Sequence, residues 1–281
     1  MGNFTTWFAR SYRAIIIVLV AIMAVMLVIL AMQHVSSARV SANAVAGPIP
    51  TFSSAPIASK KQPADALTLL EQNDRPFTIS VIGDSTGAID DNWVGQTAQW
   101  MSDKYDRPVE LHQWSVRVEP NAYQPVQTIG AGANAPIVIW NGSAEGKDIT
   151  YSLTNWDKLV PVDGAAFDLA FINHGHNVAA GKLATAGDDL LKKITGTMST
   201  AAVIVIGQNP QEDEGGTLGP AQETNVRAWM SSAKRQGYAV VDVLDVFLDQ
   251  DDYSKLLLGA VHPNRDGFTL WAQAVEKVLS A

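Results

Sequence analysis

Two polar segments of the sequence carry residues that could perform nucleophilic chemistry. Ser85 lies in Gly83-Asp84-Ser85-Thr86-Gly87, and His262 lies in Gly259-Ala260-Val261-His262-Pro263-Asn264. A serine hydroxyl becomes a useful nucleophile when a neighbouring base takes its proton, and histidine is the usual base at neutral pH. Each residue also has an ordinary interpretation, because serine is a common helix cap and a lone histidine is usually structural or solvated. The pair predicts a serine nucleophile with a histidine base if the fold brings them together.

Two further segments, residues 141–146 and 173–177, could supply groups that stabilise negative charge. A glycine in the first segment would let a substrate oxygen approach a bare backbone N–H, although an ordinary strand-to-helix loop explains this segment equally well. An asparagine in the second segment could donate its side-chain amide to an oxyanion. His174 and His176 are also candidate metal ligands, but the sequence has no cysteine and no third histidine nearby. We therefore predict neither a metal site nor a cofactor.

The elements that must position these segments alternate along the chain. Short apolar runs predict strands at 77–82, 109–114, 136–140, 167–172, 202–206 and 238–243. Helical spacing predicts helices at 92–105, 148–159, 182–195, 222–236 and 264–279, whereas 115–134 has no regular pattern. Such alternation indicates a parallel sheet with helices on both faces, whose ligand sites lie beyond the carboxyl ends of the strands. Three of the four polar segments directly follow a predicted strand, and the fourth precedes the last helix.

In this order the four segments resemble the motifs of the SGNH hydrolases, also called the GDSL esterase/lipase family. The matching residues are Gly83-Asp84-Ser85, Gly142, Gly175-His176-Asn177 and His262-Pro263-Asn264, with Gly267 following. Each short motif alone is weak, but four in order at the expected sheet positions are specific. The resemblance covers about residues 76–281 and implies a three-layer, flavodoxin-like α/β/α domain.

The resemblance also implies roles for individual residues. Ser85 would attack an ester carbonyl, while His262 would take its proton and later donate it to the leaving alcohol. The oxyanion would be held by the backbone N–H groups of Ser85 and Gly142 and by the side chain of Asn177.

One departure from the family pattern concerns the third member of the triad. The family usually has an aspartate three residues before the histidine, and Gly259 occupies that position here. A Ser–His dyad could work with a backbone carbonyl fixing the tautomer of the imidazole. Alternatively, Asp266, Asp251 or Asp252 could substitute as a displaced triad acid, or activity could be weak or absent. We favour the dyad.

The first part of the sequence predicts a membrane anchor. The nineteen residues Ala14–Met32 carry no charged side chain and are long enough, as a helix, to span a bilayer. Arg10 and Arg13 precede this span, so the preceding residues should be cytoplasmic and the rest of the chain extracytoplasmic. A cleaved signal peptide is the alternative, since small-residue cleavage sites occur at 36–38 and 42–44.

These patterns give a prediction of the domain organisation. We expect a cytoplasmic segment at 1–13, a transmembrane anchor at 14–32, a flexible linker rich in Pro, Ser and Ala at 33–65, and the SGNH-hydrolase-like domain at 66–281. If the anchor were cleaved as a signal peptide, the protein would be secreted.

Composition limits the remaining function classes. Of the 281 residues, 47% are hydrophobic, which excludes a wholly disordered chain. The absence of cysteine excludes disulfides and thiol chemistry, and a net charge of -8 argues against a nucleic-acid partner.

We therefore expect a membrane-tethered, extracytoplasmic serine esterase acting on acyl or acetyl esters. Because a tethered enzyme best serves substrates fixed in the cell envelope, we expect an acylated glycan or glycolipid as the substrate. The alternatives are an O-acyltransferase on envelope polysaccharide, a lipase or thioesterase, and a non-catalytic module that binds a glycan or another partner with a relic site.

Overall fold

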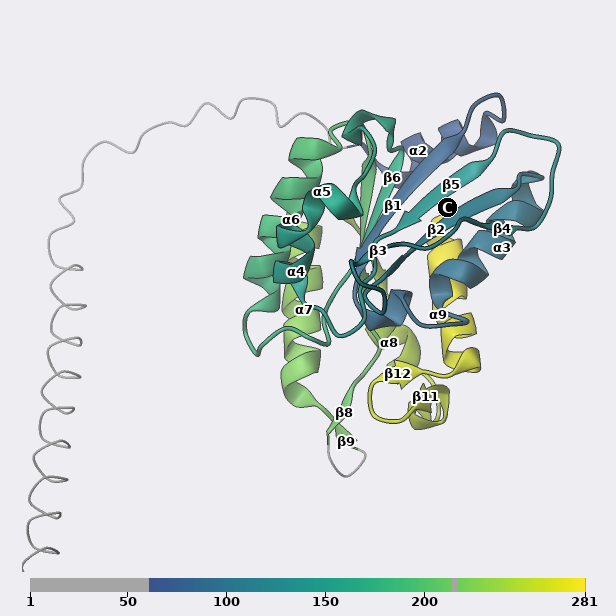
Figure 1. Ribbon diagram of the computed structural model, residues 1–281. Helices are drawn as coiled ribbons and strands as arrows, with labels where there is room; N and C mark the ends of the chain where they lie inside the picture. Colours follow the sequence, from purple (N-terminus) through teal and green to yellow (C-terminus); the bar gives the residue numbers. More distant parts are fainter. Residues whose placement is uncertain (1–60, 214–216, 281) are drawn as a thin grey trace, which may run out of the picture. The chain divides into compact units, whose positions relative to one another are not determined.

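A mostly parallel sheet lies at the centre of the structure, a computed structural model that describes residues 61–213 and 217–280 (Figure 1). The sheet order is β10-β7-β6-β1-β5-β2-β3, and β4 also pairs with β2. The parallel strands are β1 (Phe77–Gly83), β2 (Val109–Ser115), β5 (Ile137–Asn141), β6 (Leu169–Asn173), β7 (Ala202–Gly207) and β10 (Ala239–Asp242). Two short strands, β3 (Ala122–Tyr123) and β4 (Gln127–Ile129), pair antiparallel with β2.

The central strands are apolar because helices cover both faces of the sheet. Every residue of β6 and β7 is buried, and so is every residue of β1 except Thr78. Along β1, Phe77, Ile79 and Val81 contribute to one core cluster, while Ile82 contributes to the other. Strands buried on both faces are expected to be nearly continuous hydrophobic runs, which is the pattern that made them recognisable in the sequence.

One face of the sheet is covered mainly by α3 (Trp93–Tyr105) and α9 (Arg265–Val278), with α2 (Pro63–Glu71) and α8 (Val243–Leu248) also contributing to its core (Figure 1). The indole rings of Trp93 and Trp271 stack there with their centroids 6.1 Å apart. Since these residues come from α3 and α9, this contact joins an early helix of the domain to its last one.

The opposite face is covered by α4 (Ile149–Thr154), α5 (Trp156–Leu159), α6 (Leu183–Thr197) and α7 (Pro220–Arg235) (Figure 1). The helices α6 and α7 approach closely because Gly187 leaves room for the ring of Trp229. A Cβ atom at Gly187 would lie only 2.4 Å from that ring, so a larger residue would push the two helices apart.

The strand order of the sheet reverses at β1. From β1 the chain runs to β2 at the edge, returns to β5 beside β1, and then crosses to β6 on the other side of β1. Without the edge strands β2, β3 and β4, the order is the 2-1-3-4-5 arrangement of flavodoxin-like sheets. Ligands bind where such an order reverses, outside the carboxyl ends of the strands. Ser85 follows β1 at this point.

The predicted fold class is confirmed in its main features: an α/β domain with a mostly parallel sheet between two helical layers. The six predicted central strands are all present. The sheet is not wholly parallel, however, because the irregular stretch 115–134 contributes the antiparallel β3 and β4. The predicted helix 148–159 is divided into α4 and α5 at Asn155, and α2 begins at Pro63, inside the predicted linker 33–65.

Short elements complete the described structure and were not predicted. They are two small hairpins, β8 (Glu212–Asp213) with β9 (Thr217–Leu218) and β11 (Leu257–Leu258) with β12 (His262–Pro263), and three 3₁₀ turns, η1 (Ser85–Gly87), η2 (Gly164–Ala166) and η3 (Tyr253–Leu256). Two of them position the candidate site, because η1 begins with Ser85 and β12 begins with His262.

The predicted anchor Ala14–Met32 lies outside the described residues. Among the helices at 61–213 and 217–280, none combines the length and apolar character that crossing a bilayer requires.

Candidate active site

Ser85 and His262 lie 177 positions apart in the sequence and meet at the end of β1. The Oγ atom of Ser85 is 2.9 Å from Nε2 of His262. The serine is nearly buried, with 5% of its surface exposed, and the histidine is partly exposed. This distance permits direct proton transfer between the hydroxyl and the imidazole. The two residues predicted to perform the chemistry are therefore in hydrogen-bond contact.

A tight turn after β1 fixes the position of Ser85. Gly83 passes so close to β6 that a Cβ atom there would lie 2.7 Å from the carbonyl oxygen of Asn173. The next residue, Asp84, donates its backbone N–H to the same oxygen at 3.1 Å. The Asp84 side chain then accepts hydrogen bonds from the N–H and the hydroxyl of Thr86. These bonds on both sides of Ser85 hold its backbone rigidly.

A buried polar layer supports this turn from below. The side-chain NH₂ of Gln208, at the end of β7, lies within hydrogen-bond distance of Asp84, Thr86 and Asn173, its shortest contact being 2.8 Å to Asp84 Oδ1. Asn173 in turn donates to the hydroxyl of Thr86 at 2.9 Å. All four side chains are fully buried. Buried polar groups of this kind must satisfy one another, so the layer specifies a single arrangement of the strand ends.

The environment of His262 keeps the imidazole in its neutral, proton-accepting form. Partial burial lowers the pKa of His262 below the ordinary histidine value, and the nearby His176 lowers it further. The carboxylates of Asp84 and Glu145 oppose this shift, but the net direction is downward. A histidine with a lowered pKa is more completely deprotonated at neutral pH, as a general base must be.

His176 and Asn209 connect the loop after β6 to the segment that carries His262. Nε2 of His176 lies 3.1 Å from Oδ1 of Asn209, and the Asn209 NH₂ donates to the Val261 carbonyl at 2.9 Å. The amide of Asn209 is thus oriented with its oxygen toward the imidazole, so the proton of His176 belongs on Nε2. Asn209 is fully buried, and it holds the residue immediately before His262.

No carboxylate among residues 61–213 and 217–280 is seen to hydrogen-bond the His262 ring. Of the three candidate triad acids, Asp252 binds Ser254 and Lys255 through its own carboxylate. Asp251 is exposed, and Asp266 is exposed in the first turn of α9. The described residues therefore present a Ser–His pair. The prediction that Asp251, Asp252 or Asp266 replaces the missing triad acid has no contact in the described residues that supports it.

The predicted oxyanion groups differ in how available they are. The Gly142 N–H already donates to the Val81 carbonyl at 2.8 Å, as part of the pairing of β5 with β1, so it would have to leave that bond to reach a substrate. The Asn177 side chain is exposed and donates to the Lys147 carbonyl at 3.4 Å, a long bond that a stronger acceptor could replace. The oxyanion roles of Ser85 and Asn177 remain predictions. The role of Gly142 also remains a prediction, but its N–H is already engaged by the Val81 carbonyl.

An ion pair lies at the edge of the site. Arg117 contacts both carboxylate oxygens of Glu145, at 2.6 and 2.9 Å; the arginine side chain is largely exposed and that of Glu145 is partly exposed. The arginine and the charge of His262 both lower the pKa of Glu145, the arginine more strongly. Glu145 therefore places negative charge near the imidazole, although Arg117 partly neutralises it.

Sequence reasoning missed Gln208, Asn209, Glu145 and the structural role of His176. Gln208 and Asn209 directly follow the predicted strand 202–206, so the rule that strand ends carry function could have identified them. Glu145 lies within a segment that was singled out only for its glycine. The contacts of these residues depend on tertiary structure that their spacing does not reveal.

The two histidines considered as metal ligands face different partners. His174 is fully buried, and its Nε2 lies 3.0 Å from the hydroxyl of Ser152, whereas His176 contacts Asn209 and Gln211. In the described part of the chain, His, Asp and Glu side chains form no group of three or more that could hold a metal ion.

Solved structures of several esterases have a similar fold. A two-domain esterase active on acetylated mannans has a TM-score of 0.56 and 12% identity, and the alignment covers 78% of this chain and 52% of that one. A protein described as a GDSL-like lipase, from Parabacteroides merdae, has a TM-score of 0.54 and 14% identity, with 74% and 97% covered. The acetylxylan esterase from Geobacillus stearothermophilus has a TM-score of 0.51 and 12% identity, with 74% and 96% covered.

No family model matches the sequence, and no curated protein matches it significantly. The identities above are low, so the likeness concerns the fold. The parallel sheet order, the two helical layers and the similarity to these structures agree with one another. The described domain has the SGNH-hydrolase fold.

Proposed function

We propose that this protein is a serine esterase that hydrolyses acyl esters through Ser85 and His262. The observation that carries the proposal is the 2.9 Å contact between Ser85 Oγ and His262 Nε2 at the end of β1. This is the point where the strand order of the sheet reverses, which is the usual ligand position in such folds.

The reaction would proceed through an acyl-enzyme. His262 Nε2 takes the hydroxyl proton of Ser85 while Oγ attacks the ester carbonyl carbon and forms a tetrahedral oxyanion. The protonated imidazole then gives this proton to the leaving alcohol as the carbon–oxygen bond breaks. A water molecule then attacks the acyl carbon while it gives a proton to His262. The imidazole passes this proton to Ser85 Oγ as the bond between Oγ and the acyl carbon breaks, which releases the carboxylic acid and restores Ser85.

The substrate proposed is an O-acylated, in particular O-acetylated, glycan or glycolipid of the cell envelope. Support comes from the names of two structural neighbours, one active on acetylated mannans and the other an acetylxylan esterase. The apolar stretch Ala14–Met32 supports the location, because a tether to the membrane would hold the domain near envelope polymers.

The nucleophile is tested with the full-length protein and a fluorophosphonate probe, together with p-nitrophenyl acetate as substrate. Wild-type protein should be labelled at Ser85 and should hydrolyse the ester. Ser85→Ala should abolish labelling and lower kcat by roughly 10⁴-fold or more, because it removes the attacking atom.

The matched control is Ser199→Ala, which removes an exposed hydroxyl after α6 and should behave as wild type. Absence of both labelling and turnover in correctly folded wild-type protein would disprove the esterase proposal. Turnover that survives Ser85→Ala would instead show that another residue is the nucleophile.

A further inference from the structure

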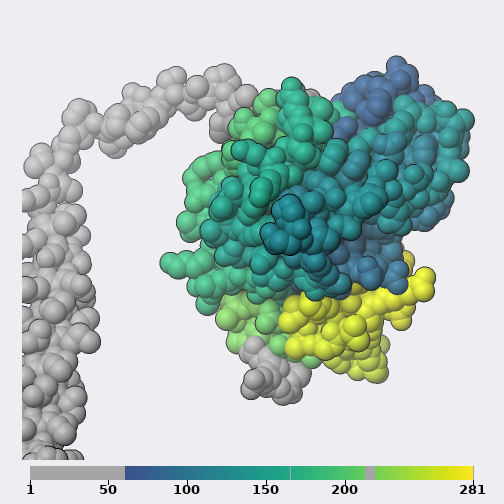
Figure 2. All heavy atoms as spheres, viewed as in Figure 1, coloured from purple at the N-terminus to yellow at the C-terminus, as the bar shows by residue number. Residues whose placement is uncertain are grey.

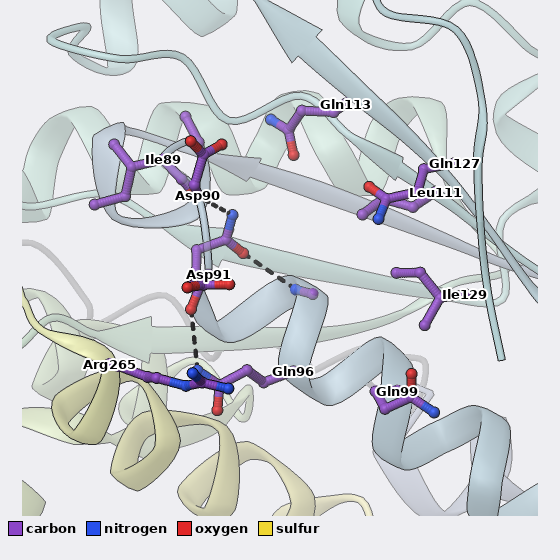
Figure 3. Close-up of a pocket in the computed structure, with 13 residues that line it drawn as sticks. Ile89, Asp90, Asp91, Gln96, Gln99, Leu111, Gln113, Gln127, Ile129 and Arg265 are labelled. Carbon is purple, nitrogen blue, oxygen red and sulfur yellow. Dashed lines mark hydrogen bonds between the residues drawn. The ribbon is translucent and has the colours of Figure 1, made fainter.

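A polar cleft opens between the start of α3, the strands β2 and β4, and the start of α9 (Figure 3). Its volume is about 540 Å³, within the range of roughly 300–1,000 Å³ that is usual for small-ligand sites. None of the predicted site residues lines it, so it is additional to the chemistry described above.

Two walls of the cleft are formed by residues that closely follow Ser85 and His262 in the sequence. On one side, Ala88 and Ile89 line the cleft, and their N–H groups donate to the Ser85 carbonyl at 3.0 and 3.1 Å. On the other side, Arg265 lines it and lies three residues after His262. A molecule in this cleft would therefore contact the two segments that immediately follow the reacting residues.

A third wall is joined to the serine turn by hydrogen bonds. Gln113, from β2, lines the cleft and accepts a hydrogen bond from the Asn141 side chain at 2.7 Å. The same Asn141 amide donates to the Gly87 carbonyl at 2.7 Å, and Gly87 ends the turn that begins with Ser85. The cleft and the nucleophile thus share one rigid framework.

The side chains that line the cleft offer both donors and acceptors. Asp90, Asp91, Gln127 and Arg265 line it and are exposed, and the structure shows no side-chain hydrogen bond or ion pair for them within 61–213 and 217–280. In Figure 3, these residues surround the opening together with Gln96, Gln99 and Gln113. Leu111 and Ile129 add a small apolar strip from β2 and β4.

This lining matches the chemistry of a sugar ring. Each hydroxyl group both donates and accepts hydrogen bonds, as amide side chains do, and carboxylates accept further bonds from hydroxyls. The apolar strip suits the C–H face of a ring. A long acyl chain in the cleft would remove water from these polar groups without offering them hydrogen bonds, which is unfavourable. A polyanionic ligand would be repelled by the carboxylates of Asp90 and Asp91.

We propose that the cleft binds the carbohydrate part of an O-acylated glycan and thereby presents its ester to Ser85. The inference rests on the proposed esterase function and adds the position of the sugar. It also separates a glycan esterase from a lipase, because the long chain of a lipid has no apolar surface of sufficient size in this cleft.

The test compares esters that share the acetyl group and differ in the alcohol. Full-length protein is given p-nitrophenyl acetate, ethyl acetate, and O-acetylated oligosaccharides of xylan and mannan, with p-nitrophenyl palmitate as the lipid substrate. The cleft variant is Asp91→Ala/Gln127→Ala, and the control is Asp249→Ala/Gln250→Ala, two exposed residues after α8.

We expect at least one sugar acetate to be hydrolysed with a higher kcat/KM than ethyl acetate. The cleft variant should raise the KM for that sugar acetate by roughly tenfold or more, through the loss of about two hydrogen bonds, and leave p-nitrophenyl acetate turnover unchanged. The proposal is overturned if no sugar acetate is preferred over ethyl acetate, if palmitate is preferred, or if the variant affects both kinds of ester equally.

A binding measurement separates failure of this inference from failure of the esterase proposal. Ser85→Ala protein is titrated with the same acetylated oligosaccharides by calorimetry, with and without Asp91→Ala/Gln127→Ala. If the oligosaccharides bind and the cleft substitutions weaken this binding, the proposed sugar site is supported even if wild-type protein hydrolyses no ester. If the oligosaccharides do not bind while wild-type protein still hydrolyses p-nitrophenyl acetate, the sugar site is refuted and the esterase proposal stands.

Discussion

At the scale of single residues, Asn209 fixes the backbone next to His262 through hydrogen bonds. Asn209 donates to the Val261 carbonyl and accepts from His176, so one buried side chain joins the two loops that meet at the imidazole. We expect a backbone fixed in this way to help keep Nε2 directed at Ser85 in the predicted Ser–His dyad.

Asn209→Ala should therefore lower kcat by more than its effect on the stability of the fold can explain. The substitution frees the segment before His262, and a displacement of about 1 Å at a reacting group can reduce the rate roughly 10²-fold. The KM for p-nitrophenyl acetate should change little, because Asn209 does not contact the site of that small ester in the proposed reaction.

The matched control is Asn225→Ala, another buried asparagine that holds a loop through the carbonyls of Val178 and Ala179. Both variants are compared by kcat, KM and thermal unfolding. If the two lose activity equally, and in proportion to their loss of stability, Asn209 has only a structural role.

The charges around His262 predict opposite pH shifts for two variants. The base must be neutral, so kcat/KM should rise with pH through the pKa of His262. The midpoint of this acidic limb of the pH profile should lie below the ordinary pKa of histidine, because the pKa of His262 is lowered. His176→Gln removes a group that lowers this pKa and should move the limb to higher pH. Glu145→Gln removes a group that raises it and should move the limb to lower pH.

The measurement is the pH profile of kcat/KM for p-nitrophenyl acetate at low ionic strength, where charge effects are least screened. Shifts in the same direction for both variants would contradict this electrostatic description. Asp103→Asn, on the exposed surface of α3, serves as a charge-neutralising control and should leave the limb in place.

At the scale of elements, how well the sequence predicts structure depends on burial. The strands β1, β6 and β7 are buried on both faces, and their apolar runs identify them without ambiguity. In contrast, β4 is mostly exposed and contains Gln127 and Thr128, so neither alternation nor apolar character marks it. Its existence depends on pairing with β2, which is a tertiary contact.

The same distinction applies to the candidate site. Ser85 and His262 were predictable because a nucleophile at a strand end and a histidine before the last helix have recognisable positions. The engagement of the Gly142 N–H by Val81 was not, because it depends on the register of β5 against β1. Asn209 and Gln208 act through hydrogen bonds to segments far away in sequence, which no local pattern encodes.

Arg107 illustrates an element contact that carries stability. Its guanidinium is fully buried and donates to carbonyl oxygens at the amino-terminal end of the sheet, those of Leu70, Gln72, Arg75, Ala135 and Pro136. Arg107→Met should lower the free energy of unfolding by about 3 kcal/mol or more, because several buried acceptors lose their donor.

Urea denaturation of Arg107→Met and of Arg235→Met, an exposed arginine at the end of α7, measures this effect. The control should change stability by less than about 0.5 kcal/mol. A loss below about 1 kcal/mol in Arg107→Met would mean that water replaces the guanidinium at these carbonyls.

At the scale of the whole molecule, the proposed membrane tether makes a prediction about the full chain. We expect full-length protein expressed in a bacterial host to sediment with membranes and to resist extraction at alkaline pH, because Ala14–Met32 would span the bilayer. Ile22→Lys/Val25→Lys, close to the middle of the span, should release it, since each charge at the membrane centre costs about 2.5–3.5 kcal/mol.

Protease added outside the inner membrane should digest the domain if it is extracytoplasmic. The control Thr5→Lys/Thr6→Lys adds two charges before Arg10 and should leave the protein in the membrane, consistent with a cytoplasmic start of the chain. A full-length protein found in the soluble fraction would exclude the anchor, and loss of the first residues in mass spectrometry would indicate a cleaved signal peptide.

The distance of 177 positions between Ser85 and His262 also has a consequence for timing. The turn carrying Ser85 forms near the start of the domain, whereas His262 is supplied by its last segment, directly before α9. That helix packs against α3 through Trp271 and Trp93, and Figure 2 shows the yellow carboxyl-terminal part beside the blue part of the surface. A chain that is still being synthesised or threaded through a membrane has the nucleophile but no base. The proposed activity would therefore begin only after the segment carrying His262 has been made, and esters met earlier would be left intact.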